Sequence, residues 1–556
     1  MISSEPSSNA VNRAGPTAVD ATVAAKRWRR LKFSFCWAVL WLAVFQFAEN
    51  TADPDLWGHL ICGQETLRTR QFPMTELYSW TARGQPFVDH EWLSEVCLGG
   101  VHFLGGGSGL LLLKMLLGLA TLGLSLQLGA AGMAWPERAL AWALAALAVV
   151  EISFGFAARP QIFTALFLVS ELWLLHRIHA GGRSWTAAVP LLFALWINLH
   201  GGVLAGFGLL GLTAGTSTAQ WLFSRIRSPQ SSPDSASVPA LKTLICLWAS
   251  VALAAVAMLV NPWKVGLLRW LVGSVLWLRP EIQEWNPTPF GWDHAAFFIL
   301  VAVAAFAWVF SRRPRAWWEM AACGAFVLLG WRAVRNAPLC SLVILALVPR
   351  HLSDALQRFR GQVGRLEAWC RETSVQKTAT VLFGAAGIAA GASTFTLHKE
   401  HAFTIEVPAA QYPLGALAFL GDHRLSGKML VYFDWGELVI FQYPDCPPSI
   451  DGRLDTCYSR ELIAEHWKFF RGEPVNQQVL NLDAADLALL PSSIPGGYEL
   501  AKRPGWKVVY YDPTAMLLVR DAQRFPDLAR LSLPVPGPKS ASQGRAALAN
   551  RSPRWN

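Results

Sequence analysis

The chain has 556 residues, of which 53% are hydrophobic and only 15% are charged. A soluble globular protein has about 25% charged residues, so this composition excludes that class and indicates a membrane protein that crosses the bilayer many times. The formal net charge of +10 is accounted for by basic loops on one side of the membrane. Nucleic-acid binding is not predicted, because the sequence has no stripe of basic residues interleaved with aromatic residues.

The N-terminal segment is polar and rich in Ser, Ala and Pro. We expect residues 1–25 to be disordered and cytoplasmic. They contain no apolar stretch, so no cleavable signal peptide is predicted. Basic residues directly before the first apolar run place the N-terminus in the cytoplasm. These are Lys26, Arg27, Arg29, Arg30 and Lys32.

A transmembrane domain is predicted over residues 33–396. It contains about eleven apolar segments, most of them close to the roughly 17–25 residues that cross a bilayer. The expected spans are 33–50, 108–130, 138–157, 161–178, 186–200, 202–222, 242–260, 293–311, 317–333, 337–349 and 378–396. With the N-terminus inside, every inside connection carries arginine, as the positive-inside rule requires. The first outer loop, 51–107, is long.

The composition becomes that of a soluble domain after the last span. An odd number of spans places this domain, residues 402–529, outside the cytoplasm, and the tail at 534–556 is expected to be disordered. The predicted elements are a strand at Met429–Phe433, a helix or second strand at Gly436–Tyr443, a strand and turn at Pro448–Arg453, a strand at Leu487–Leu490, and a hairpin of Trp506–Tyr511 with Met516–Arg520. The expected fold class is therefore an α-helical polytopic membrane protein with a small C-terminal soluble α/β domain.

Two cysteines of the C-terminal domain leave an alternative open. Cys446 and Cys457 form a disulfide if the domain lies in an oxidising compartment, and they are free thiols otherwise.

The first outer loop begins with two aspartates, Asp53 and Asp55, separated by one proline. Such a pair can hold a divalent cation, Mg²⁺ or Mn²⁺, through carboxylate oxygens. Alternatively, one carboxylate deprotonates an acceptor hydroxyl as a general base, or one aspartate only caps a helix. His59 lies on the same face as Asp55 if a helix begins there.

The other outer connections also carry polar residues at membrane depth. An ionisable group at the centre of a membrane helix costs about 2.5–3.5 kcal/mol, so these residues indicate a functional cavity. Arg159, Arg332 and Arg335 offer the planar forks of donors that suit a phosphate. The alternative is contact with lipid headgroups or a salt bridge to Asp53, Asp55 or Glu284. Further candidates for the cavity are His59, Glu91, Gln161, Asn198, His200, Glu284 and Trp285, although His200 is also explained as a structural histidine.

Together these motifs resemble the GT-C superfamily of membrane glycosyltransferases, which includes oligosaccharyltransferases, protein mannosyltransferases and aminoarabinose transferases. The resemblance is to a bacterial branch and covers residues 33–520. The motifs are Asp53-Pro-Asp55-Leu-Trp57-Gly-His59, Glu91-Trp92, Arg159-Pro-Gln161, Asn198-Leu-His200-Gly-Gly202, Glu284-Trp285, Arg332, and Ile450-Asp451-Gly452-Arg453 followed by Tyr458.

The resemblance implies a polyprenyl-phosphate sugar donor that enters from the membrane, and inversion at the anomeric carbon. It assigns the role of base or metal ligand to Asp53 and Asp55, and donor-phosphate binding to Arg332, with Arg159 and Arg335 beside it. One departure concerns the acceptor. The string nearest to the Trp-Trp-Asp motif of oligosaccharyltransferases, Trp317-Trp318-Glu319, falls on the predicted cytoplasmic side. Transfer to an asparagine sequon is therefore not expected, and the acceptor is a glycan, a lipid or a protein.

The sequence thus predicts a glycosyltransferase of the cell envelope in the plasma (bacterial inner) membrane, acting on the extracytoplasmic face. Two alternatives stay open at this point. A transporter or lipid flippase would place its site near the midplane between related halves, and no such repeat is present. A non-catalytic protein of envelope assembly would use the C-terminal domain for binding.

Overall fold

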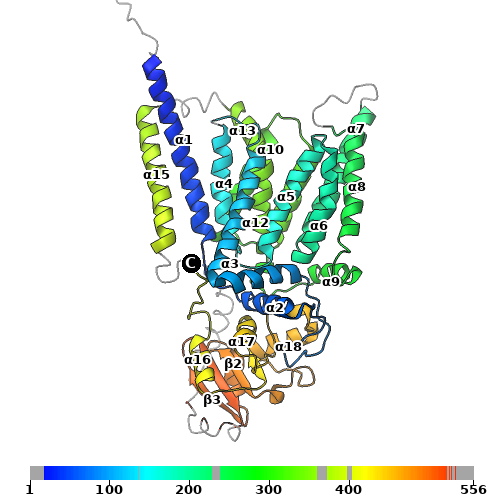
Figure 1. The fold of residues 1–556 in the computed structure, drawn as a ribbon, viewed down its shortest axis with the longest axis vertical. Coiled ribbons are helices and arrows are strands. Elements are labelled where there is room, and N and C mark those ends of the chain that lie inside the picture. Colours follow the sequence, from blue (N-terminus) through cyan, green and yellow to red (C-terminus); the bar gives the residue numbers. More distant parts are fainter. Residues whose placement is uncertain are drawn as a thin grey trace, which may run out of the picture.

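The structure is a computed structural model that describes residues 18–135, 137–227, 238–359, 372–396 and 403–521, and the single residues 525, 528 and 533. A bundle of helices stands on a smaller α/β domain (Figure 1). The predicted fold class is therefore confirmed. We call the end of the bundle that faces this domain the lower end and the opposite end the upper end, as drawn in Figure 1. The predicted disordered tail at 534–556, and residues 1–17 of the N-terminal segment, lie outside the described residues.

Each predicted span coincides with a helix. These helices are α1 (Ala18–Phe47), α3 (Trp92–Gly129), α4 (Glu137–Ser153), α5 (Gln161–His179), α6 (Ala188–Leu199), α7 (Val203–Arg227), α8 (Leu241–Ala257), α10 (Ala295–Phe310), α11 (Trp317–Arg332), α12 (Ala337–Leu347) and α15 (Thr373–Thr396). By length and composition, five helices of the described chain can cross a membrane. A sixth is added if α12 and α13 (Pro349–Arg358), bent by 60°, form one span. The number of about eleven spans stays a prediction.

Helices at the lower end differ from the predicted pattern. α2 (Leu56–Thr69) and α9 (Val265–Val275) lie across this end, beneath the upright helices (Figure 1). α3 is bent at Gly106, where φ is 57° and ψ is −150°, a conformation that only glycine adopts readily. Its first part therefore lies along the lower end before the rest turns upward. α1 begins at Ala18, inside the segment predicted to be disordered, because its alanine-rich first turns favour a helix.

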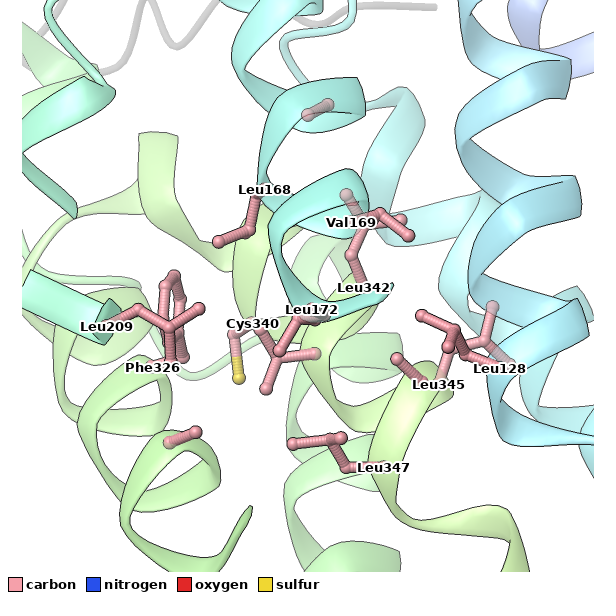
Figure 2. Packing of buried hydrophobic residues seen from close by; sticks show 14 of the residues in the cluster. Leu128, Leu168, Val169, Leu172, Leu209, Phe326, Cys340, Leu342, Leu345 and Leu347 are labelled. Carbon is pink, nitrogen blue, oxygen red and sulfur yellow. The ribbon is translucent and has the colours of Figure 1, made fainter. Parts of the chain in front are cut away.

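The centre of the bundle is α12, which is apolar on all sides. Its residues from Leu342 to Leu347 are at most 1% exposed, as expected for a helix surrounded by other helices. Figure 2 shows how its side chains pack against α5 and neighbouring helices. The labelled residues are Leu168, Val169 and Leu172 of α5; Cys340, Leu342, Leu345 and Leu347 of α12; and Leu128, Leu209 and Phe326 around them. Because α5 and α12 are held in place by this packing, the polar connections at their ends are held in place as well.

The C-terminal domain contains a four-stranded sheet in the order β1-β2-β4-β3. β1 (Met429–Val431) runs parallel to β2 (Leu487–Pro491), and β4 (Ala515–Arg520) is antiparallel to β2 and to β3 (Trp506–Tyr511). The strands predicted at these places are confirmed, and Gly436–Gln442 is helix α17. The remaining helices are α16 (Leu414–Asp422), α18 (Arg460–Phe470) and α19 (Pro495–Ala501).

The strand predicted at Pro448–Arg453 is wrong. This stretch forms only an isolated bridge between Met429 and Pro448. Proline has no N–H to donate to a ladder, and the chain then turns so that the Asp451 and Arg453 side chains meet. Nearby, Cys446 and Cys457 are both buried and free.

The same turn fastens the domain to the first loop through Arg453. Its Nη2 lies 2.7 Å from Oδ2 of Asp451 and 3.1 Å from Oε1 of Glu76, and its Nη1 pairs with the other oxygen of Glu76. Tyr458 donates a hydrogen bond of 2.6 Å to Asp451. Glu76 and Asp451 are fully buried. Because an unpaired buried charge is costly, Arg453 holds loop and domain together.

We expect the substitution Arg453→Gln to destabilise this junction by about 3–5 kcal/mol, since it leaves two buried carboxylates without their cation. Thermal unfolding of the protein in nanodiscs, together with the rate of trypsin cleavage within residues 403–521, would measure the effect. Arg471→Gln is the matched control because Arg471 pairs with Glu473 at the surface. Equal stability of the two variants would contradict the role of Arg453.

Candidate functional site

Charged side chains from four separate connections meet at the lower end of the bundle. Arg159 precedes α5 and lies among three carboxylates: its Nε is 3.3 Å from Oδ1 of Asp53, its Nη2 pairs with Asp55, and its Nη1 is 3.4 Å from Oε2 of Glu284. Glu284 in turn binds Nη1 of Arg335 at 3.2 Å. The salt bridges expected as an alternative use of the arginines are thus present, and they join Asp53, Asp55, Arg159, Glu284 and Arg335 in one cluster.

The two aspartates are held in different ways. The backbone N–H of Asp55 donates a 3.0 Å hydrogen bond to Oδ1 of Asp53, so the Asp-Pro-Asp turn is closed on itself. Asp55 stands at the N-cap of α2 but makes no capping bond with its side chain. The side chain of Asp53 is 4% exposed and that of Asp55 is 22% exposed. Burial raises the pKa of Asp53 to about 6, with Arg159 opposing this rise and Asp55 adding to it.

A second group forms around Glu91, which directly precedes α3. Its Oε1 lies 3.2 Å from Nε2 of His90 and 3.4 Å from Nε2 of His200, and its Oε2 lies 4.0 Å from Nε2 of His59. The N–H of Gly202 donates to Nδ1 of His200 at 3.0 Å. The proton of a neutral His200 therefore sits on Nε2, facing Glu91. Burial raises the pKa of Glu91, but the surrounding imidazoles lower it below its ordinary value.

Asn198 and Gln161 have structural contacts. Oδ1 of Asn198 accepts a hydrogen bond of 2.8 Å from the indole of Trp92, and its amide donates to the carbonyl of Val260 at 2.7 Å. These bonds tie α6 to α3 and to the end of α8. Gln161 donates to the backbone carbonyl of Gly155. Both residues therefore stabilise the connections from which the charged cluster is built, and neither is part of the cluster itself.

Two guanidinium groups lie against the ring of Trp285. Arg335 is 4.4 Å from its ring centroid and Arg279, which sequence reasoning missed, is 4.5 Å away. Arg279 is buried and pairs with Asp455 of the C-terminal domain at 2.9 Å. Arg332, the last residue of α11, is exposed and forms no ion pair within the described part of the chain.

The C-terminal domain adds acidic groups that the sequence analysis did not select. Glu437 is buried and accepts a 2.9 Å hydrogen bond from the N–H of Gly58. A Cβ at Gly452 would collide with Asp55 and lie 2.8 Å from Oε1 of Glu437. Burial and then the charge of Asp55 raise the pKa of Glu437 well above its usual range, and the pKa of Asp434 to about 7. The signal in the sequence was a single acid within the apolar stretch of α17.

The site can be compared with the requirements of the expected cation. The described residues contain no group of three or more His, Cys, Asp or Glu side chains that could hold a metal ion. Mg²⁺ requires a nearly octahedral shell of oxygen ligands at about 2.0–2.1 Å. Here the guanidinium of Arg159 supplies the positive charge between Asp53 and Asp55. The two aspartates therefore form an ion-paired carboxylate site, and a bound cation would have to displace Arg159.

The sequence matches no known family model and no curated protein. The fold is similar to that of the oligosaccharyltransferase of Archaeoglobus fulgidus in the apo form, with a TM-score of 0.51, 12% identity, and coverage of 82% of this chain and 69% of that chain. For the same enzyme tethered to an acceptor peptide with the NVT sequon, the TM-score is 0.50 and the identity is 13%, and the match covers 82% of this chain and 69% of that chain. For ArnT from Cupriavidus metallidurans in the apo state, the TM-score is 0.48 and the identity is 14%, and the match covers 90% of this chain and 99% of that chain. The two oligosaccharyltransferase comparisons confirm the resemblance to the GT-C superfamily as a similarity of fold.

We expect Arg159→Gln to destabilise the protein more at pH 8 than at pH 5. Without the guanidinium, the pKa of Asp53 in the folded protein rises further above 6, whereas the unfolded chain loses this proton near its ordinary pKa; the folded state therefore loses more stability at pH 8 than at pH 5. Thermal unfolding at the two pH values would measure this difference. Arg68→Gln, which removes an exposed arginine on α2, is the control. A deficit independent of pH would contradict the ion-pair assignment.

Proposed function

We propose that this chain is a membrane glycosyltransferase that transfers a sugar from a polyprenyl-phosphate donor to an acceptor. The observation that carries the proposal is the meeting of Asp53, Asp55, Arg159, Glu284 and Arg335 between the lower end of the bundle and the C-terminal domain. Such a transfer needs a base for the acceptor and positive charge for the leaving phosphate. This cluster contains both, within a fold similar to that of an oligosaccharyltransferase.

In the proposed reaction Asp55 is the base. Its side chain is more exposed than that of Asp53 and adjoins Gly452 of the C-terminal domain. The carboxylate takes the proton from an acceptor hydroxyl, the hydroxyl oxygen attacks the anomeric carbon, and polyprenyl phosphate leaves with the bonding electron pair. Asp53, bound to the backbone of Asp55 and to Arg159, positions the base. Mg²⁺ or Mn²⁺ on the two aspartates is the alternative that requires Arg159 to move.

Arg335 is proposed to bind the leaving phosphate. Its guanidinium stacks on Trp285 and makes its one described ion pair with Glu284. A planar fork with remaining donors suits phosphate oxygens and stabilises the charge that develops on them. Arg332 lies near it in sequence at the exposed end of α11 and is a second phosphate candidate. Arg159 is the third, although its three carboxylate partners occupy it.

The acceptor is proposed to bind where the C-terminal domain covers Asp55. The related oligosaccharyltransferase has been described with a tethered acceptor peptide containing the NVT sequon. In this chain Trp318 and Glu319 of the Trp317-Trp318-Glu319 string line a cavity together with Arg350 of α13, at the upper end of the bundle. It therefore lies away from the proposed site. We propose a glycan, lipid or protein acceptor without transfer to an asparagine sequon.

The first test uses the full chain in nanodiscs with a panel of polyprenyl-phosphate sugars, following release of free polyprenyl phosphate. We expect turnover by the wild-type protein and a loss of about 10²–10⁴-fold for Asp55→Asn, the range that a general base contributes. Asp445→Asn, at an exposed aspartate of the same domain, is the control. Arms with Mn²⁺ and with EDTA distinguish a metal ligand from a base. Equal turnover by Asp55→Asn and wild type would remove Asp55 from the mechanism.

A second test addresses the side of the membrane. We propose that the lower end is extracytoplasmic, in the plasma (bacterial inner) membrane. Lys502→Cys, on the exposed surface of the C-terminal domain, should then react with an impermeant maleimide on intact cells, whereas Arg227→Cys at the end of α7 should react only after lysis. Labelling in the reverse pattern would place the domain in the cytoplasm and refute the proposed topology.

A further inference from the structure

A polar cavity lies at the upper end of the bundle, opposite the proposed catalytic site. Its volume is about 230 Å³, and α5, α7, α11, α13 and the connection before α11 contribute side chains to it. Pockets that enclose drug-sized ligands are roughly 300–1,000 Å³, so this cavity fits a small charged group. The proposed glycosyl transfer uses none of its residues.

Glu319 of α11 lies in the wall of this cavity between two imidazole rings. Its Oε1 is 3.4 Å from Nε2 of His176 on α5, and its Oε2 is 3.6 Å from Nε2 of His351 on α13. Nδ1 of His176 is 2.9 Å from the carbonyl oxygen of Leu172, a group that can only accept. The Nδ1 atom of His176 therefore carries a proton. In the neutral ring Nε2 would then present a lone pair to the carboxylate.

The same constraint applies to His351. Its Nδ1 is 3.0 Å from Oγ of Ser311, and that hydroxyl donates its proton to Oδ2 of Asp354 at 3.0 Å. The Ser311 oxygen is therefore an acceptor and Nδ1 of His351 the donor. Both rings thus turn an unprotonated Nε2 toward one carboxylate unless the group holds an additional proton. A lone pair on Nε2 needs a donor, which Arg350 supplies to His176 and which the group gains at His351 when it takes up a proton.

Two arginines line the same cavity. Arg350 places Nη2 3.4 Å from Nε2 of His176, and Arg313 lies in the connection between α10 and α11. Neither guanidinium forms an ion pair with a carboxylate among the residues for which the structure gives contacts, and both oxygens of Glu319 face histidines. Within the described part of the chain, both guanidinium groups thus lack a carboxylate at ion-pair distance.

We propose that this cavity binds a phosphate group, as a free anion or as a lipid headgroup, and that binding takes up a proton. Two guanidinium groups supply the planar donors that phosphate prefers, and a bound dianion favours the imidazolium forms of the neighbouring rings. The charged and titratable groups that face the cavity or its hydrogen bonds are His176 and His179 on α5, Glu319 on α11, Arg350, His351 and Asp354 on α13, and Arg313. α7 contributes the uncharged Ser217 and Gln220.

Isothermal titration calorimetry with inorganic phosphate, on the full chain in nanodiscs of phosphatidylcholine, tests the site. We expect the double substitution Arg313→Gln/Arg350→Gln to weaken binding tenfold or more, since each charged hydrogen bond contributes about 1.5–3 kcal/mol. Glu319→Gln should strengthen binding, because it removes the one carboxylate that faces the anion. Arg358→Gln, an exposed arginine on α13, is the matched control. Arg335→Gln removes the proposed catalytic phosphate contact and should leave this binding unchanged.

The proton is measured with sulfate, which does not titrate near pH 7. Titrations in two buffers of different ionisation enthalpy should show proton uptake by the wild-type protein and less uptake by His351→Gln. Competition by phosphatidic acid in the nanodiscs would assign the site to a lipid headgroup, and its absence would assign the site to a free anion. The double substitution Arg313→Lys/Arg350→Lys keeps both charges. It should retain part of the phosphate binding if the glutamine variant loses binding because of the missing charges and not because it is misfolded. If neither phosphate nor phosphatidic acid binds in a way that depends on Arg313 and Arg350, the proposal is wrong.

Discussion

The lower end of the bundle depends on the guanidinium of Arg159. It lies among Asp53, Asp55 and Glu284, and these carboxylates come from two connections that are far apart in the sequence. Three acids gathered in a mostly buried place would repel one another and lose their hydration. One mostly buried cation offsets both effects, so the first loop, the start of α5 and the connection before α10 converge on it. The position of Asp55 is a consequence of this ion pairing.

Arg453 joins the C-terminal domain to the first loop by ion pairs, as Arg159 joins the connections at the lower end of the bundle. It joins Glu76 of the first loop to Asp451 of the domain. The next residue back, Gly452, then lies so close to Asp55 that no side chain fits between them. Arg453 thus fixes the position of the domain beneath the aspartates. A change at either junction would alter access to Asp55 without touching it.

The apolar helices and most of the strands could be predicted from the sequence because apolar length and alternation are local properties. The cluster of Asp53, Asp55 and Arg159 was predicted in part, since outer connections gather at one end of a bundle. The place of Glu437 beside this cluster could not be predicted, because its hydrogen-bond partner Gly58 is 379 residues away in the sequence and no local pattern indicates that contact. The strand expected at Pro448–Arg453 failed because the prolines and the Arg453 ion pairs dictate a turn.

The pairing of the charges also constrains what each end of the bundle can bind. At the lower end Arg335 already has Glu284 as its partner, so a phosphate there must replace a carboxylate that is held in place. A free anion gains little from this exchange. A lipid-linked donor is already concentrated beside the site, because each methylene of its chain contributes about 0.8 kcal/mol to its retention in the membrane. The paired state of Arg335 therefore favours a membrane-anchored ligand, as the proposed polyprenyl-phosphate donor is. At the upper end Arg313 and Arg350 have no ion pair with a carboxylate among the described residues, so an anion there displaces no such partner.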